Sequence, residues 1–434
     1  MIIILIYILI IFYIIQKWRF FEIEGLKKYE FQSVFFLKLI AAYFLYWIYT
    51  KYYNQRHIAD IFKFYDDSKI ISDAFFSKPK DFLCMILGIN YDNNYFESNY
   101  FINMNHWDTS YTTVLMNESR LIIKVNAILN ILGFNSYGFN LISFLMIGYF
   151  GVLLIIKVVF NQIQVHGKRL FFWSIMLFPS IIFWTSGILK EPLTFFFIGL
   201  ILHNLNSISR RKSKKIINYI FLIISAGFLF MIKFYVFACL IPSLLSYFII
   251  KKNFYNPIKS CLYISLIILI LIVLTSTFNS DYSPLLLLSK KQNDFILLAE
   301  FYRSGSYFSL PVIDNSLVNF ILALPFGIFN GLFRPLPNDI NKTIHLLPFF
   351  ENIILYSTIL FMLVKFNLSL KKISIKTKQI IFPCLLFTLY LYTLTGLSTP
   401  VVGALVRYKI PGLLFLIISL NIIYDASKLR NRKK

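Results

Sequence analysis

The sequence predicts an all-α, polytopic integral membrane protein, on the basis of its composition, its long apolar segments and the placement of its basic residues. Hydrophobic side chains make up 58% of the 434 residues and charged side chains only 15%. A soluble domain carries about 25% charged residues. With a mean hydropathy of +0.69, most of this chain is expected to contact lipid.

Apolar segments long enough to cross a bilayer recur along the chain. A membrane-spanning helix needs about 20 mostly apolar residues, or somewhat fewer where neighbouring helices bury its ends. We expect a single transmembrane domain, residues 1–434, with about eleven such helices. A retained first helix is expected, because no basic leader or cleavage site accompanies it. The segments lie near 1–16, 31–50, 138–157, 170–186, 191–206, 217–232, 235–250, 258–277, 350–366, 380–397 and 410–424.

Lysine and arginine cluster between these segments and predict their orientation, because short cytoplasmic loops are enriched in both. The predicted N-terminus is outside the cytoplasmic (inner) membrane, and the C-terminus is in the cytoplasm. The net charge of +23 then reflects topology, and nucleic-acid binding is not expected, since it requires a contiguous basic surface. The cytoplasmic clusters lie at 16–28, 166–169, 210–215, 251–252, 371–378 and 428–434.

One apolar segment, 317–333, does not fit as a simple span. It is interrupted by Pro325, Gly327 and Gly331, and both of its flanks fall on the outer side. Irregular backbone survives at membrane depth only where protein or a water-filled cavity satisfies its polar groups. We expect a re-entrant hairpin that lines a cavity; the alternative is a kinked full span.

The long outer loop, 51–137, is the leading candidate for chemistry, because it holds nine of the chain's twenty acidic residues. A carboxylate held at a membrane surface can act as a general base, or bind a divalent cation against a phosphate. Asp60 is the first choice because it lies closest to the predicted membrane boundary, and Asp66 and Asp67 follow. The alternative is a solvated loop whose acids balance its basic residues.

Three further turns carry cations at the same predicted face. In Ser186-Gly-Ile-Leu-Lys-Glu-Pro192, Lys190 can bind a phosphate or pair with an acid of the loop, and Glu191 lies at a positive helix end. Arg334 follows the 317–333 segment, and Arg407 and Lys409 precede the last span. Guanidinium groups match phosphate oxygens in pairs, so these residues are candidates to clamp a lipid-linked phosphate. Contact with lipid headgroups is the alternative for each.

Several other classes of site are not indicated. The four cysteines are scattered without a CxxC pair, and the five histidines lack the spacing of a metal-binding helix. No metal site is therefore specified, although a divalent cation remains the one cofactor that the acidic loop would suit. His106 is the only histidine that we single out. A P-loop, a dinucleotide-binding fingerprint and a Ser-His-Asp arrangement are not found, so nucleotide-driven transport and hydride transfer are not expected.

Five short stretches carry a family resemblance by their order along the chain. They are Asp60 with Tyr65-Asp-Asp-Ser68, Asn117-Glu-Ser-Arg120 before Asn126, Ser186-Gly-Ile-Leu-Lys-Glu191, Phe333-Arg-Pro-Leu-Pro337 and Gly403-Ala-Leu-Val-Arg-Tyr-Lys-Ile-Pro411. In this order they resemble bacterial multi-spanning proteins of surface-polysaccharide gene clusters, of the GT-C glycosyltransferase and polysaccharide-polymerase type. The resemblance spans most of the chain.

The resemblance implies a membrane-helix fold with an extracytoplasmic first loop, and a polyprenyl-phosphate or polyprenyl-pyrophosphate sugar as donor. It makes an acid of that loop the catalytic base or a metal contact, which maps onto Asp60 and then onto Asp66 or Asp67. The chain departs from the pattern in having no Asp-x-Asp pair and in having Lys124 where an arginine is expected. The candidate substrate-binding residues are Arg120, Lys190, Glu191, Arg334, Arg407 and Tyr408.

We therefore expect an enzyme, a membrane glycosyltransferase or polysaccharide polymerase of cell-envelope assembly. Asp60 would deprotonate the acceptor hydroxyl, and Lys190, Arg334 and Arg407 would hold the leaving phosphate. The first alternative is a flippase or secondary transporter of a lipid-linked precursor, which usually has internal repeats and charges at the membrane midplane. A scaffold for such an assembly is a further alternative. Polyprenyl-linked sugar and membrane lipid are the expected partners; the sequence specifies no oligomeric state.

Overall fold

The computed structural model describes residues 2–52, 56, 59–107, 118–210, 215–251, 256–277, 283–314, 316–366 and 373–432. Over these residues the protein is all-helical, as predicted; one isolated β-bridge joins Tyr307 to Val401, and no strand is formed. Eight of the described helices are long and apolar enough to cross a membrane. These features are those of a polytopic membrane protein.

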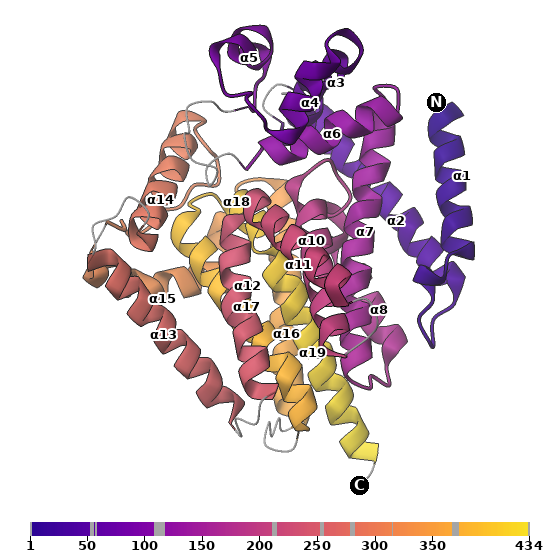
Figure 1. The fold of residues 1–434 in the computed structure, drawn as a ribbon. Helices are drawn as coiled ribbons and strands as arrows, with labels where there is room; N and C mark the ends of the chain where they lie inside the picture. The colour runs from indigo at the N-terminus through magenta and orange to yellow at the C-terminus, as the bar shows by residue number, and fades with distance from the viewer. Residues whose placement is uncertain are drawn as a thin grey trace. The chain divides into compact units, whose positions relative to one another are not determined.

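The chain divides into two compact units, each described by itself below. Unit 1 comprises Met1–Asn161 and Met176–Phe237, and unit 2 comprises Gln162–Ile175 and Ala238–Lys434. The helices of unit 1 are α1 (Ile2–Lys17), α2 (Lys28–Trp47), α3 (Asp60–Ser77), α4 (Pro79–Leu87), α5 (Asn94–Asn99), α6 (Arg120–Leu132), α7 (Tyr137–Gln162), α9 (Pro179–Trp184), α10 (Lys190–Ser209) and α11 (Lys215–Ile232) (Figure 1).

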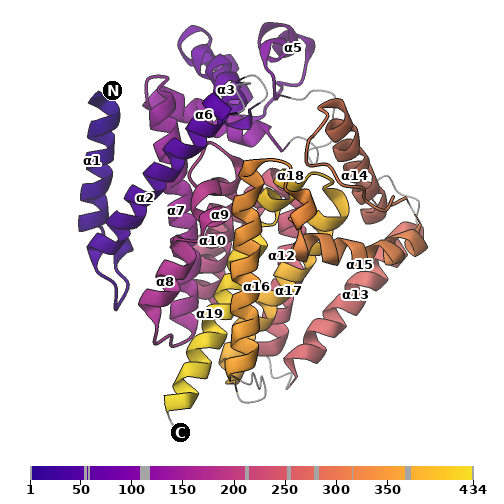
Figure 2. The same ribbon diagram turned by 180° about the vertical axis from the view of Figure 1, so that it is seen from behind.

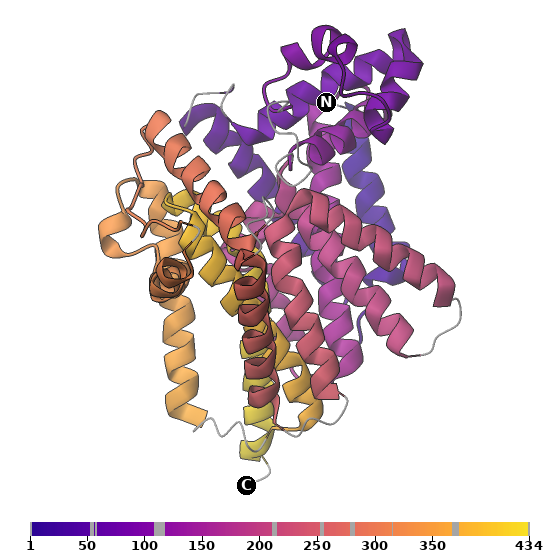
Figure 3. The same ribbon diagram turned by 60° about the vertical axis from the view of Figure 1, so that its left-hand side comes forward.

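Unit 1 combines long apolar helices with a group of shorter ones. Figures 1 and 3 show α3, α4 and α5 gathered beyond the N-terminal end of α7. Among the long helices, α7 and α10 approach closely because glycines face the opposing backbone: a Cβ on Gly151 would lie 2.4 Å from the Phe195 carbonyl carbon. Small residues at such contacts let membrane helices pack without side chains between them.

Unit 2 is built around one central helix. Its helices are α8 (Lys168–Met176), most of α12 (Phe234–Lys251), α13 (Pro257–Thr277), α14 (Pro284–Phe301), α15 (Leu317–Phe333), α16 (Leu346–Phe366), α17 (Ile375–Ser398), α18 (Val402–Tyr408) and α19 (Ile410–Arg432). The central helix is α17, which packs extensively against α15 and α19.

The apolar helices follow the predicted segments with one exception. Eight candidate spans and the shorter apolar helices α1 and α11 coincide with ten predicted segments. The segment 170–186 is not one helix: it divides into α8 and α9, and Phe178 between them has extended backbone. Pro179 accounts for this, because a residue before proline is disfavoured in the helical region. The number of segments that cross the membrane stays a prediction.

The expected hairpin at 317–333 is wrong. The segment is a single helix, α15, that continues through Pro325, and Figures 1 and 2 show it running across the directions of α16 and α17. Its glycines serve packing instead of a chain reversal. A Cβ on Gly331 would lie 2.1 Å from the Tyr392 carbonyl oxygen, and one on Gly396 of α17 would lie 2.1 Å from the Gly327 oxygen. The two helices therefore meet backbone to backbone.

This contact predicts that Gly331→Ala is destabilising. The added methyl group would collide with backbone, which no rotamer change relieves, so α15 must shift; we expect the free energy of unfolding to fall by about 1–3 kcal/mol. The matched control is Gly227→Ala in α11, where a Cβ meets nothing within 4 Å and where alanine is the better helix former. Thermal unfolding of the two purified variants checks this, and equal stability would contradict the close contact.

Candidate functional site

The predicted first loop contains a packed helical core. Between α2 and α7 the chain forms α3, α4, α5 and α6, which share a buried apolar cluster that includes Phe64, Phe101, Trp107 and Ile123. Acidic residues on these helices are therefore held in fixed positions. Asp108, two residues after His106, lies outside the described residues.

Asp60 lies beside a histidine at the start of α3. Its Oδ1 is 3.4 Å from Nε2 of His106, and the two side chains are 32% and 30% exposed. The imidazole ring packs on Phe64, with the ring centroids 5.0 Å apart. As the first residue of α3, Asp60 also lies where a carboxylate is favoured by the helix dipole. A carboxylate and an imidazole in contact, both open to solvent, can accept and hold a proton.

Asp67 fixes the backbone that carries His106. Its carboxylate accepts hydrogen bonds from the backbone N–H of Asn105 at 2.8 Å and of His106 at 2.7 Å. Burial raises the pKa of Asp67, although these two donors oppose the shift. Asp66 differs again, since both of its oxygens accept from the Arg56 guanidinium, at 2.7 and 3.0 Å. Asp60 is thus the one of the three predicted acids that faces a histidine; their roles stay predictions.

Lys190 makes the contact with a loop acid that its sequence position suggested. Its Nζ is 3.4 Å from Oε2 of Glu118, and the side chains are 15% and 17% exposed. The same Nζ lies 5.9 Å from the centroid of the Phe64 ring, the ring on which His106 packs. Phe64 therefore connects the Asp60–His106 pair with the Lys190–Glu118 pair.

Glu191, the next residue along α10, is buried away from solvent. Its Oε1 is 2.8 Å from Nζ of Lys233, and the two side chains are 0% and 2% exposed. A second buried cation, Lys38 of α2, donates to Oγ1 of Thr185 at 2.6 Å and to Oγ of Ser186 at 3.2 Å. Sequence analysis missed both lysines. Their signal was a charged residue within or next to an apolar segment, which is costly unless it has a role.

Arg120 and Lys124, one turn apart on α6, share an aromatic wall. Arg120 donates to the Tyr91 hydroxyl at 3.0 Å and to Asp92 at 3.1 Å. Nζ of Lys124 lies 4.8 Å from the Tyr91 ring centroid and 5.9 Å from that of Trp107. Burial, and then the charge of Arg120, lower the pKa of Lys124 to about 8. Arg120, which ends the Asn117–Arg120 stretch, and Lys124, where the family pattern expects an arginine, therefore lie side by side on the same rings.

The remaining candidates belong to unit 2. Arg334 is ion-paired with Asp339, and its Nε donates a hydrogen bond to Oδ1 of Asn330 at 3.0 Å. Its guanidinium lies 3.8 Å from the centroid of the Phe308 ring. Lys409 holds this turn by donating to the Arg334 carbonyl at 2.7 Å. Arg407 is half-buried on α18.

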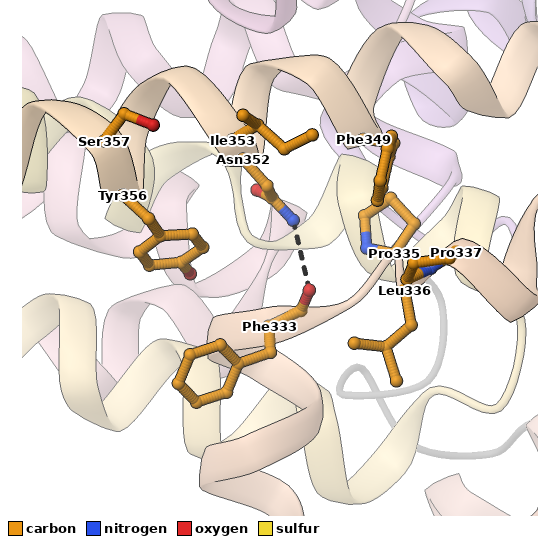
Figure 4. A pocket seen from close by; sticks show the side chains of 9 residues that line it. All are labelled: Phe333, Pro335, Leu336, Pro337, Phe349, Asn352, Ile353, Tyr356 and Ser357. Atoms are coloured by element: carbon orange, nitrogen blue, oxygen red, sulfur yellow. Dashed lines mark hydrogen bonds between the residues drawn. The ribbon is translucent and has the colours of Figure 1, made fainter.

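Unit 2 also contains an aromatic contact of Tyr408 and an apolar pocket. The Tyr408 ring lies 5.7 Å from that of Phe295 on α14. The pocket, of about 290 Å³, lies beside the turn that carries Arg334 and is mainly apolar (Figure 4). Asn352 donates to the Arg334 carbonyl at 3.0 Å, which fixes one edge of the pocket. Its lining is Phe333, Pro335, Leu336, Pro337, Phe349, Asn352, Ile353, Tyr356 and Ser357.

Metal ligands and similarity to known proteins are the last two features of the site to consider. Among the described residues, no three or more His, Cys, Asp or Glu side chains gather as metal ligands would, so a role for a divalent cation stays a prediction. Comparison with protein-family models, curated proteins and solved structures gives no match.

The lowered pKa of Lys124 predicts a pH-dependent stability. Between pH values of about 8 and 10.5 the unfolded chain binds more protons at this group than the folded chain does. The folded state therefore gains stability as pH rises through this window and loses it as pH falls. As pH rises from about 8 to 10.5, the unfolding temperature of wild type should increase relative to that of Lys124→Met. Parallel profiles would contradict this, and Lys80→Met, which removes an exposed lysine of α4, is the control.

The Glu191–Lys233 pair predicts a non-additive mutation cycle. Either single replacement, Glu191→Leu or Lys233→Met, leaves one buried charge without its partner and should cost about 3–5 kcal/mol of unfolding free energy. Replacing both removes the uncompensated charge, so the double variant should be more stable than either single variant. Thermal unfolding of the four proteins tests this; a double variant less stable than both single variants would contradict a direct pair.

Proposed function

We propose that this protein is a membrane glycosyltransferase or polysaccharide polymerase, which moves a sugar or oligosaccharide from a polyprenyl-(pyro)phosphate carrier to an acceptor. The observation that carries the proposal is the Asp60–His106 pair with Lys190 beside it. Asp60 and His106 lie on a helical region between the candidate spans Lys28–Lys51 and Tyr137–Gln162, and Lys190 is the first residue of the candidate span Lys190–Ser209. Lipid-linked substrates present their reactive phosphate at such a boundary.

The chemistry needs a base and a cation, and both are provided. Asp60 takes the proton of the acceptor hydroxyl, whose oxygen forms a bond to the anomeric carbon while the bond from that carbon to the phosphate oxygen breaks. The leaving (pyro)phosphate keeps the electron pair, and the Lys190 ammonium stabilises its charge. His106 orients the Asp60 carboxylate and shares the proton that it receives. The donor is already activated, so positioning supplies much of the catalysis.

Glu118 gives Lys190 a partner when no phosphate is bound. The pair is partly buried, with side chains 15% and 17% exposed. A phosphate that carries more charge than one carboxylate can compete with Glu118 for the Lys190 ammonium. Glu118 thereby keeps the Lys190 side chain ordered while leaving its ammonium able to bind the substrate phosphate.

Unit 2, considered by itself, holds the other residues that the sequence singles out. Arg334 and Arg407 are proposed to bind phosphate oxygens and Tyr408 to contact substrate, and the pocket in Figure 4 suits isoprene units because its lining is mostly apolar. Arg120 and Glu191 complete the proposed set: Arg120 would contact substrate from its place beside Tyr91 and Asp92, and Glu191 acts through Lys233. We place the site at the outer face of the cytoplasmic membrane, with the N-terminus outside.

A second candidate function, movement of the lipid-linked precursor across the membrane, is favoured by one observation. Lys38 lies within the candidate span Lys28–Lys51 and is buried, and ionisable residues inside membrane helices often mark transport pathways. Its partners are hydroxyl and carbonyl groups of the turn before α10. The two functions differ in which face of the membrane accumulates precursor when the protein is lost.

The proposal predicts that Asp60→Asn abolishes polymer formation in the host while the protein is inserted at normal levels. The amide cannot accept the acceptor proton, although it preserves size, and removal of a general base typically costs about 10²–10⁴-fold in rate. The control is Asp73→Asn, at an exposed position of the same helix, which should make normal polymer. The measurement is mass spectrometry of surface polysaccharide and lipid-linked intermediates.

The outcomes of that experiment separate the functions. An externally accessible, complete lipid-linked unit that accumulates in Asp60→Asn supports a polymerase, and a unit short by one sugar supports a single-sugar transferase. Precursor confined to the cytoplasmic face would favour the transporter. Wild-type polymer from a normally inserted Asp60→Asn protein would remove Asp60 from the mechanism.

A further inference from the structure

The turn that presents Lys190 is held from two sides by buried lysines. The 185–191 turn consists of the connection from α9 to α10, residues 185–189, and the first two residues of α10; its Lys190 contacts Glu118. Lys38 binds the beginning of the turn, and Lys233 binds its end through Glu191. The two lysines come from α2 and from the junction of α11 with α12, far apart in sequence.

At its first residues the turn is fixed by Lys38. The ammonium donates to Oγ1 and the carbonyl oxygen of Thr185, at 2.6 and 3.4 Å, and to Oγ of Ser186 at 3.2 Å. The two hydroxyls in turn donate to carbonyls of α9, each at 2.6 Å. An ammonium has three protons to donate, so this set of acceptors matches its capacity and sets its direction.

Packing prevents the turn from moving between these anchors. Ile188 and Leu189 are buried, and a Cβ on Gly187 would lie 2.2 Å from Cδ2 of Leu45. On the other side of the turn, a Cβ on Gly148 of α7 would lie 2.7 Å from the Thr185 carbonyl oxygen. Apolar side chains could fill the same space without a desolvation penalty. A buried charge is costly unless hydrogen bonds or a counter-ion compensate it, so packing alone does not account for a lysine here.

We propose that Lys38 and the Glu191–Lys233 pair are positioning residues, which fix the 185–191 turn so that the Lys190 ammonium faces Glu118 and Phe64. Lys38 sets where the turn begins, and Lys233 sets where α10 begins. Lys190, between them, then has little freedom except in its own side chain. The inference rests on the proposed function only in assigning a phosphate to Lys190; the placement of that ammonium does not depend on it.

The test measures the reactivity of Lys190 directly. Full-length protein in lipid nanodiscs is acetylated with N-succinimidyl acetate at fixed pH, and the rate at Lys190 is followed by mass spectrometry of its peptide. In Lys38→Met the turn loses its first anchor, so Lys190 should separate from Glu118 and react severalfold faster than in wild type. Thr185→Val, which removes one acceptor and nearly preserves volume, should act in the same direction with a smaller effect.

The control is Lys157→Met. Lys157 is a partly buried lysine of α7 in the same unit, and it donates to the Phe20 carbonyl instead of to the turn. Its loss should lower the unfolding temperature without changing the rate at Lys190. An unchanged Lys190 rate in folded Lys38→Met and Thr185→Val proteins would overturn the proposal, as would an equal increase in Lys157→Met.

An activity measurement separates this inference from the proposed function. If wild type transfers sugar from a polyprenyl-pyrophosphate donor, Thr185→Val should raise KM for the donor more than it lowers kcat, because the phosphate-binding cation is displaced. If Lys190 becomes more reactive in the variants and wild type shows no transfer, the positioning role stands and the transferase fails. Transfer that is unaffected, with an unchanged Lys190 rate, overturns the positioning role alone.

Discussion

Buried lysines in apolar helices must find their hydrogen-bond acceptors inside the protein, and in unit 1 this requirement determines where the turn before α10 lies. Water is not at hand to solvate Lys38, so its ammonium is satisfied by the Thr185 and Ser186 hydroxyls. Lys233 is satisfied by Glu191. Each pairing joins segments more than 40 residues apart in sequence, so together they bring α2, α10 and the start of α12 to one place.

Unit 2 meets the same requirement through backbone contacts more than through charge pairs. Gly327 and Gly331 allow α15 to approach α17 closely, and this approach places the Gly331 and Arg334 carbonyls where Lys409 donates to both. The turn that follows α15 is therefore tied to the residue before α19. A side chain at Gly331 would disturb more than packing, because the Lys409 acceptors move with the helix. Close packing and polar satisfaction depend on each other here.

The sequence predicted the helical class and most apolar helices, because hydrophobicity and length are local properties that a chain displays directly. For Lys190 it offered pairing with an acid of the first loop as one option beside phosphate binding, since both lie at the same predicted boundary, and the structure has Lys190 3.4 Å from Glu118. It did not predict that α15 is one continuous helix through Pro325, because the neighbouring helix α17 supplies contacts that outweigh the local helix breakers. Nor did it indicate the Asp60–His106 contact, which depends on Asp67 binding the backbone at His106 and so on tertiary structure.

Two adjacent residues at the start of α10, Lys190 and Glu191, lie in different surroundings. The lysine points to a partly exposed acid, and the glutamate to a lysine that solvent does not reach. Replacing one counter-ion by another keeps a charge compensated, whereas breaking a fully buried pair leaves one charge uncompensated and is costly. The helix start can therefore exchange partners on one side and stay fixed on the other. Under the proposed function, a cation that exchanges a carboxylate for a phosphate needs that combination, since a freely moving turn would lose the geometry of the exchange.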